Sequence, residues 1–528
     1  MSRYKKAAIV GLVLFPVVAG GFVFQQRAVQ SGTRLFEQVV AIVGERYVDS
    51  LDTGTLYEKA ARGLVAELRD PYAELYSAKQ LDSFNTTTGG FYAGVGMQIE
   101  PQDGAIVISK VFPNTPAAEA GILEGDRIVA VDSQSTRGWK IEQVSGKLKG
   151  PPGTKVSARF ARQGVEQFTV QFTRKVVRIP AVPYAMMLDS KTAYIFVQGF
   201  NETAAEEVAK ELQRLSADGA KGVVLDLRGN PGGFLDQALV MTNLFLDKGK
   251  EILAVRGRGQ PEQRAFAESV PIAPKIPLVI LTDGYTASAS EIVAGALQDH
   301  DRALIVGTTS FGKGLVQSLY KLDGGYAIKL TTAKWYTPSG RSIQKERKLT
   351  DDGQLVEVRP DSLETEAARR SRPVFKSDGG RVVYGGGAIT PDLIVPSDTL
   401  TSAEQKLARA LSSKQQESYV TLYEYGFELK GRVNPDFEVT PAMKDEFYTR
   451  LQKKGVNIDR KDWDAGIAYV DRLLDNRIAR FAFGDSTAKR RDLHDDPQLR
   501  KALDLLKRGQ SQRDLLALAA VVPVKQTK

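Results

Sequence analysis

The 528-residue sequence contains no cysteine and only two histidines, His300 and His494. The absence of cysteine excludes disulfide bonds, thiol nucleophiles and cysteine-ligated metal sites. Two histidines are too few for a histidine-rich metal site, and no metal or organic cofactor is implied by the remaining residues. Hydrolytic chemistry in this chain would therefore need one of these two histidines as its base, or a base of another kind.

The sequence also lacks an arginine-rich run interleaved with aromatic residues. Its net charge of +9 is spread over the whole chain, which is typical of a solvated basic surface and gives no sign of nucleic-acid binding. Hydrophobic residues at 42% and charged residues at 26% are ordinary for a folded soluble protein. Because one hydrophobic core rarely exceeds about 250–300 residues, several domains are expected.

The only long uncharged run, from Ala7 to Phe24, follows Arg3, Lys5 and Lys6. At about 1.5 Å per residue this run barely spans a hydrocarbon core. Residues 1–30 are therefore expected to be a signal peptide or a membrane anchor, and both alternatives fit. The basic flank predicts that the rest of the chain is exported to the periplasm or another extracytoplasmic space, either released or anchored to the inner membrane.

Changes in composition and hydrophobic periodicity predict four further regions. Residues 31–88 have helical periodicity, and residues 89–178 contain short strand-like runs (VGMQI, AIVISKV, RIVAVD) separated by turns. Residues 179–400 read as an α/β domain with a polar insertion at 344–384. Residues 401–528 are charged and helical, with structural packing as the favoured role over oligomerisation or partner docking.

The α/β domain alternates strand-like and helix-like segments. The expected strands are AYIFVQGF, GVVLDLRG, IPLVILTD and RALIVG, and amphipathic helical stretches lie between them. This alternation predicts crossover units and a largely parallel sheet. In such sheets ligands bind at the carboxyl ends of the strands, so chemistry is expected in the strand-to-helix turns.

The first such turn is LDLRGNPGG, with Gly229, Gly232 and Gly233 around Pro231. Glycines allow backbone N–H groups to point outward, which suits an anion or a developing oxyanion. The turn has no GK[ST] continuation, so it does not match a phosphate-binding P-loop. A tight glycine turn without chemistry remains the alternative.

The second turn is TDGYTASASEI, with hydroxyls at Thr286, Ser288 and Ser290. Ser288 and Glu291 have the S-x-x-E spacing of a helix capping box. The small residues around Ser288 would also leave room for a substrate carbonyl, and the Ala289 N–H at the helix start could stabilise an oxyanion. Spacing alone favours the cap over a nucleophile.

A serine nucleophile needs a base. His300 lies ~18 Å along the same helix from Ser288, and His494 lies in the charged tail. The remaining candidate is Lys313, which is flanked by two glycines at the start of an apolar strand. Burial there would lower the lysine pKa, as a Ser-Lys mechanism requires. In an extended chain Gln317 would lie on the same face as Lys313 and could orient its amine.

These segments in this order resemble the carboxyl-terminal processing (tail-specific) peptidases, which are PDZ-containing Ser-Lys proteases. The resemblance implies an α/β protease core of βα units, crotonase-like and ClpP-like, with an inserted β-rich PDZ domain and helical N- and C-terminal regions. It further implies site roles, which are a Ser288 nucleophile, a Lys313 general base, a lysine-orienting Gln317, and an oxyanion hole from Ala289 with Gly232 or Gly233. Thr286 stands where the family commonly has serine, which leaves Ser288 unaffected.

The β-rich module carries its own resemblance. YAGVGMQIE is similar to the carboxylate-binding loop of bacterial PDZ domains, in which Gly94, Val95, Gly96 and Met97 would aim N–H groups at a peptide carboxylate. The apolar side chains of this loop favour apolar C-termini. KGPPGT resembles the family's Arg-Gly-Pro turn, with Lys149 in place of arginine and therefore a less directional cation.

The sequence thus predicts an exported serine endopeptidase that recognises apolar protein C-termini and cleaves upstream through an acyl-enzyme. We expect a homo-oligomer, association with the membrane through the N-terminal segment, and use of an adaptor protein. Two alternatives stay open, namely a PDZ-based scaffold with an inactive protease-like domain and an acyl-CoA enzyme of related architecture. YTPSGRSIQ and GAITPDLIVP are interpreted as structural segments that close the core.

Overall fold

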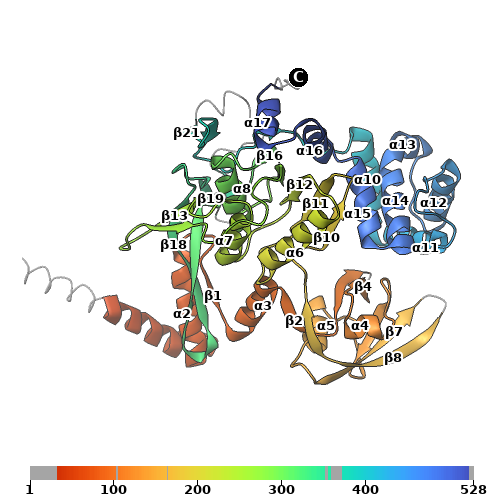
Figure 1. Cartoon of the computed structure of the whole chain (residues 1–528). Coiled ribbons are helices and arrows are strands. Elements are labelled where there is room, and N and C mark those ends of the chain that lie inside the picture. Colours follow the sequence, from red (N-terminus) through yellow and green to blue (C-terminus); the bar gives the residue numbers. More distant parts are fainter. Residues whose placement is uncertain (1–31, 103–104, 163–164, 351–354, 358–371, 522–528) are drawn as a thin grey trace, which may run out of the picture. The chain divides into compact units, whose positions relative to one another are not determined.

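The computed structural model describes residues 32–102, 105–162, 165–350, 355–357 and 372–521. The segment expected to be a signal peptide or anchor lies outside these residues. In the part of the chain that is described, no helix is both long and apolar enough to cross a membrane. The chain divides into two units, and each is described separately below (Figure 1).

Among the described residues, the first unit contains 32–81, 317–331, 349–350 and 355–356. It includes a helix at 32–46, α2 (Thr53–Glu67) and β1 (Glu74–Tyr76). Arg62 of α2 donates to the Leu75 carbonyl at 2.9 Å, which holds the helix beside the strand. β1 pairs antiparallel with the first residues of β18 (Ala327–Tyr336).

The second unit is built around a six-stranded sheet of order β10-β11-β12-β15-β16-β23. All neighbouring strands are parallel except β10 and β11. The strands are β10 (Tyr184–Met187), β11 (Thr192–Phe196), β12 (Gly222–Asp226), β15 (Leu278–Thr282), β16 (Leu304–Gly307) and β23 (Leu393–Ile394). The predicted α/β alternation is confirmed.

Helices cover both faces of this sheet because its strands are apolar on both sides. One face packs on α6 (Ala204–Ala217), α7 (Leu235–Asn243) and α8 (Ala289–Asp299). The opposite face packs on α16 (Pro497–Arg508) and α17 (Gln512–Val521), the dark blue helices of Figure 1. The last helices of the chain are therefore part of the core of the α/β domain.

A second sheet lies in the same unit, where β13 (Glu251–Gly257) pairs antiparallel with β14 (Gln263–Phe266). The other edge of β13 pairs with residues 333–336 of β18. Within the region expected to be a polar insertion, the described residues form short strands. These are β19 (Arg347–Leu349), β20 (Leu355–Glu357), β21 (Val374–Lys376) and β22 (Val382–Tyr384).

The β-rich module forms an antiparallel sheet of order β3-β4-β5-β7-β8, and β6 pairs with β5. Separately, β2 (Phe91–Gly94) pairs with β9 (Lys175–Arg178). The remaining elements are β3 (Met97–Gln102), β4 (Ala105–Val111), α4 (Pro116–Glu119), β5 (Arg127–Val131), β6 (Gln134–Ser135), α5 (Ile141–Leu148), β7 (Lys155–Arg162) and β8 (Val165–Thr173). The strands predicted from VGMQI, AIVISKV and RIVAVD are confirmed as β3, β4 and β5.

The C-terminal region is helical, as predicted. Before α16 it contains α10 (Ser402–Ser413), α11 (Gln415–Leu429), α12 (Pro441–Lys453), α13 (Arg460–Ala465), α14 (Ile467–Phe483) and α15 (Asp485–His494). Helices α10 to α15 share a hydrophobic core of their own, centred on Trp463, Phe447 and Leu474. This core is separate from the one that α16 and α17 complete.

Candidate active site

Ser288 lies in the turn between β15 and α8, at the carboxyl end of the sheet. Its backbone has φ 55° and ψ −113°, a conformation that non-glycine residues rarely adopt and that stores strain. Ser288 is the N-cap of α8 and forms the predicted capping box with Glu291. The structural role expected from spacing is therefore present, and it coexists with an unusual backbone.

The two neighbouring hydroxyls hold this turn against the glycine turn that follows β12. Thr286 Oγ1 donates to the Leu227 carbonyl at 2.8 Å, and Ser290 Oγ donates to the Asn230 carbonyl at 3.1 Å. Both side chains are fully buried. Thr286 and Ser290 are thus engaged in joining two turns, which leaves Ser288 as the candidate nucleophile among the three hydroxyls.

The glycine turn reaches the serine at Gly232. A side chain on Gly232 would meet the Ala287 carbonyl oxygen at 2.7 Å and the Ser288 Cβ at 2.9 Å, so only glycine fits. The φ of 96° at this position also favours glycine. Gly232 therefore allows the close approach of the two turns.

The hydrogen bonds distinguish the two glycines expected at the oxyanion hole. The N–H of Gly232 donates to Asn230 Oδ1 at 2.9 Å, so it is already occupied. The N–H groups of Gly233 and Ala289 have no partner among the residues that the structure describes. They are the backbone donors left for a ligand at this place.

Glu291 connects Ser288 to the segment that carries Lys313. Its Oε2 accepts the N–H of Ser288 at 2.8 Å and the N–H of Lys313 at 2.9 Å. Its Oε1 accepts the Ser310 hydroxyl at 2.5 Å and the Gly312 N–H at 2.6 Å. Complete burial raises the pKa of Glu291, while these four donors act in the opposite direction.

Lys313 is half-buried and precedes β17 (Leu315–Lys321). The strand was predicted to begin at Lys313 and begins two residues later, because the Lys313 N–H is directed to Glu291. The Lys313 carbonyl accepts the indole N–H of Trp335 at 3.1 Å. Gln317 belongs to the other unit, where its Nε2 lies 3.5 Å from Thr331 Oγ1, and its expected orienting role stays a prediction.

The two histidines lie away from this chemistry. His300 is the C-cap of α8, and its ring nitrogens contact Asp378 Oδ2 at 2.9 Å and the Glu251 carbonyl at 2.7 Å. His494 ends α15 and is exposed. Across the described ranges no cluster of three or more His, Asp or Glu side chains could hold a metal ion.

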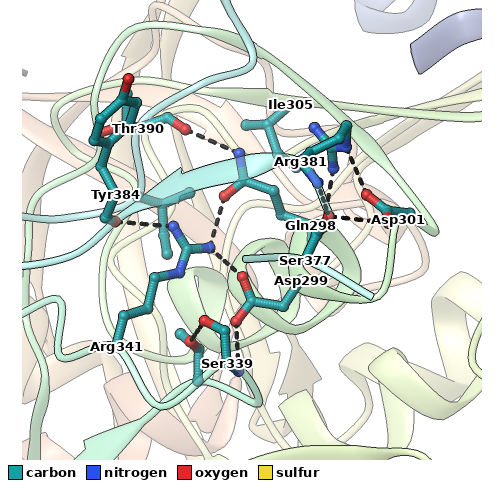
Figure 2. A network of polar contacts seen from close by, with 12 residues as sticks. Gln298, Asp299, Asp301, Ile305, Ser339, Arg341, Ser377, Arg381, Tyr384 and Thr390 are labelled. Atoms are coloured by element: carbon teal, nitrogen blue, oxygen red, sulfur yellow. Dashed lines mark hydrogen bonds and ion pairs between the residues drawn. The ribbon is translucent and has the colours of Figure 1, made fainter. Parts of the chain in front are cut away.

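The far end of α8 is fixed by the buried polar network of Figure 2. Arg341 is fully buried and pairs with Asp299 at 2.7 Å and with Gln298 Oε1 at 2.7 Å. Arg381 adds ion pairs with Asp301 and Asp392, each at 2.5 Å. Because Arg341 belongs to YTPSGRSIQ and Asp392 to GAITPDLIVP, these two segments have the structural role expected for them.

In the β-rich module the loop of residues 94–97 joins β2 to β3. Val95 and Met97 are buried in the module's core, and the Gly96 carbonyl accepts the Phe112 N–H at 3.0 Å. Gly94 lies under the Tyr92 ring, because a side chain on Gly94 would meet Tyr92 Cε2 at 2.8 Å.

Tyr92 also meets the groups expected to bind a peptide carboxylate. Burial raises the pKa of Tyr92 to about 12, while the nearby N–H groups of Gly96 and Met97 act to lower this pKa. The Lys149 ammonium lies 5.4 Å from the centre of the Tyr92 ring. The phenol of Tyr92 therefore lies near backbone donors of the loop.

Sequence reasoning missed two polar side chains that shape the site. It assigned Glu291 only a capping role, and it gave no role to Asn230, whose fully buried side chain donates to the Val197 carbonyl at 2.8 Å and accepts from Gly232. A signal for Asn230 was present, because a polar residue inside a glycine turn after a buried strand often bonds its own backbone.

Comparisons with known proteins relate the chain to one peptidase family and to the PDZ domain. Residues 191–355 match the model of Peptidase family S41, and residues 107–162 match that of the PDZ domain. The carboxy-terminal processing protease CtpA of Bacillus subtilis is 35% identical over 337 residues, which are 63% of this chain and 72% of that protein. The carboxy-terminal-processing protease of Bartonella bacilliformis is 38% identical over 315 residues, 58% of this chain and 72% of that protein. Among solved structures, the photosystem II D1 C-terminal processing protease is 28% identical, covering 60% of this chain and 84% of that chain with a TM-score of 0.35.

Proposed function

The chain belongs to peptidase family S41 as a carboxy-terminal processing serine protease with a PDZ domain, and from this premise we propose that Ser288 and Lys313 cleave the peptide bond as a Ser-Lys dyad. The observation that carries the proposal is the shared Glu291 oxygen, which accepts the N–H groups of both residues. The strained backbone of Ser288 is typical of a nucleophile presented at a strand-to-helix turn.

In the proposed reaction the neutral amine of Lys313 takes the proton of the Ser288 hydroxyl while Oγ attacks the substrate carbonyl carbon. The N–H groups of Ala289 and Gly233 bind the oxyanion of the tetrahedral intermediate. As the intermediate collapses, the Lys313 ammonium gives its proton to the leaving amine and the acyl-enzyme remains. Water then attacks the ester while Lys313 takes a proton from it. As the second tetrahedral intermediate collapses, the Lys313 ammonium returns this proton to Ser288 Oγ, which releases the new carboxylic acid and regenerates the enzyme.

We further propose that the PDZ domain binds the C-terminus of the substrate protein through the loop of residues 94–97. The proposed preference for apolar C-termini rests on the apolar sequence of this loop, whose Val95 and Met97 side chains pack in the core of the module. Peptide-binding domains of this kind hold the terminal carboxylate on successive backbone N–H groups. Cleavage would then occur upstream of the bound end.

Export of the protein is also a proposal. It is supported by the basic residues and the uncharged run at the N-terminus. Cell fractionation and N-terminal sequencing of the mature protein test it. Recovery of the full-length chain in the cytoplasm would contradict export, and an intact N-terminus in the membrane fraction would indicate an anchor.

The dyad is tested by Ser288→Ala and Lys313→Ala in the full chain, with Ser412→Ala and Lys321→Ala as controls at exposed positions. The probe is an unfolded test protein with an apolar C-terminus. Both dyad variants should lose turnover and keep binding of the C-terminal peptide, while both controls cleave like the wild type. Cleavage by either dyad variant at the wild-type rate would contradict the proposed mechanism.

A further inference from the structure

The C-terminal helix α16 reaches the glycine turn of the active site. Its residues Leu499, Ala502 and Leu505 are buried against the sheet face formed by β12, β15 and β16. Asp496 and Gln498 at the beginning of α16 contact Arg228, which lies just after the end of β12, where the glycine turn starts. The contact joins residues about 270 positions apart in the chain.

Arg228, the first residue of the turn after Leu227, receives partners from both segments. Its Nε and Nη2 bind the two oxygens of Asp226 at 2.9 and 2.6 Å. Its Nη1 lies 2.6 Å from Asp496 Oδ2 and 2.9 Å from Gln498 Oε1. Burial acts to lower the pKa of Arg228, and the carboxylates of Asp226 and Asp496 outweigh it and raise the pKa.

Asp496 and Gln498, the two partners of Arg228 at the start of α16, are held in place by further hydrogen bonds. Asp496 is the N-cap of α16, and its Oδ1 accepts the N–H groups of Gln498 at 2.9 Å and Leu499 at 3.0 Å. Gln498 is fully buried, and its Nε2 donates to the Val395 carbonyl at 2.8 Å. One carboxylate therefore caps the helix with one oxygen and holds Arg228 with the other.

Arg228 is the first residue of the glycine turn, and residues 229–233 form the rest of it. The next residue, Gly229, donates its N–H to Asp283 at 3.0 Å, and Asn230 accepts the N–H of Ala287 at 3.0 Å. The turn is thus held at its start by Arg228 and further along by the segment that carries Ser288. A shift at Arg228 would be transmitted to the unpaired N–H of Gly233.

We propose that Asp496 and Gln498 of the C-terminal extension are positioning residues of the peptidase, which hold Arg228 and thereby the glycine turn in the geometry that binds the oxyanion. The inference rests on the proposed function, because it assumes that the turn stabilises the oxyanion. It gives the C-terminal extension a part in catalysis beyond packing.

Asp496 allows its two roles to be separated. Asn is as good an N-cap as Asp, so Asp496→Asn keeps the cap, removes the charge and turns an amide donor towards Arg228. Asp496→Glu keeps the charge and lengthens the side chain that caps the helix. Asp459, the N-cap of α13 that accepts the Lys461 N–H at 2.8 Å, provides the matched control Asp459→Asn.

The experiment measures kcat and KM on an internally quenched peptide with an apolar C-terminus, together with Tm, for each full-length variant. Asp496→Asn should lower kcat about 10-fold with KM unchanged, because a misplaced oxyanion donor weakens binding of the transition state. Its Tm should also fall, because the largely buried Arg228 loses one carboxylate. Asp496→Glu should recover most of kcat although its Tm falls. Asp459→Asn should leave all three quantities at the wild-type values.

Wild-type kcat in Asp496→Asn would overturn the inference, and so would a loss of kcat that tracks Tm across the three variants. The proposed function fails in a different way, through cleavage that survives in Ser288→Ala. A second readout is the rate of labelling of Ser288 by a fluorophosphonate, whose phosphonyl oxygen occupies the oxyanion position. This rate should fall in Asp496→Asn by the same factor as kcat, and an unchanged rate would contradict the proposal.

Discussion

Glu291 Oε2 accepts the backbone N–H of Lys313 at 2.9 Å. The two residues are 22 positions apart and come from different secondary-structure segments. Since the same oxygen also accepts the N–H of Ser288, one buried carboxylate sets the backbone positions of both members of the proposed dyad. The position of the Glu291 carboxylate therefore affects the alignment of the two reacting side chains, although the carboxylate itself takes no part in the proposed chemistry.

Replacing Glu291 by Gln should lower kcat about 100-fold with little change in KM. The amide has one acceptor oxygen and one NH₂ group, so any backbone N–H on its NH₂ side loses its acceptor, although the Ser310 hydroxyl could accept from the NH₂ group instead. Steady-state kinetics on the quenched peptide measures the effect. The matched control is Glu404→Gln, which alters the capping-box glutamate of α10 with Thr401 and should leave kcat unchanged. Equal losses in the two variants would attribute the effect to helix capping.

The stability of the protein should carry a pH dependence that belongs to Glu291. Burial raises the pKa of this carboxyl above its ordinary value of 4.5, so the folded state binds the proton more tightly than the unfolded state. The stability that this group contributes is then present below about pH 4.5 and is lost as the pH rises through the folded pKa. Urea unfolding of wild type and Glu291→Gln should show a difference in free energy that falls with rising pH. A difference that increases with pH would mean that the four donors outweigh burial.

Much of the site follows from local pattern. The strand-to-helix alternation predicted the sheet, and the sheet predicted that chemistry would lie in strand-to-helix turns such as LDLRGNPGG and TDGYTASASEI. The spacing of Ser288 and Glu291 predicted the capping box, which is present. These features depend on residues only a few positions apart, and periodicity describes such relationships well.

The remaining contacts depend on tertiary packing that no local pattern describes. The second role of Glu291 requires Ser310, Gly312 and Lys313 to fold over α8. The contact of Asp496 with Arg228 requires α16 to cover the far face of the sheet. Sequence reasoning assigned Asp496 no role, because a long-range ion pair leaves no periodic signal.

Replacing the buried Arg341 should strongly lower the free energy of unfolding. In Arg341→Ala the Asp299 carboxylate loses its ion pair and stays buried, which costs about 3–5 kcal/mol in the free energy of unfolding. Arg264 is half-exposed and pairs with Glu251 and Glu262, so the control Arg264→Ala should cost less than about 1 kcal/mol. Urea denaturation compares the two. Similar losses would show that the network of Figure 2 is no more important than a surface ion pair.

The Tyr92 phenol should compete with a peptide carboxylate for the PDZ loop. Its oxygen lies near the N–H groups of Gly96 and Met97, so we expect a bound C-terminus to displace it. Tyr92→Phe removes the competing hydroxyl and keeps the ring beneath Lys149. Because a neutral hydrogen bond contributes about 1 kcal/mol net, Kd for a peptide with a free apolar C-terminus should fall about 5-fold.

Fluorescence anisotropy of a labelled peptide measures this change, and the same peptide with an amidated C-terminus is the control. The amide lacks the carboxylate that the vacated N–H groups would bind, so its weaker affinity should not improve in Tyr92→Phe. Weaker binding of the free carboxylate in the variant would reverse the interpretation, because the phenol would then be a direct partner of the peptide. Equal gains for both peptides would indicate that the hydroxyl acts on the shape of the groove, since only a carboxylate can use the two freed donors fully.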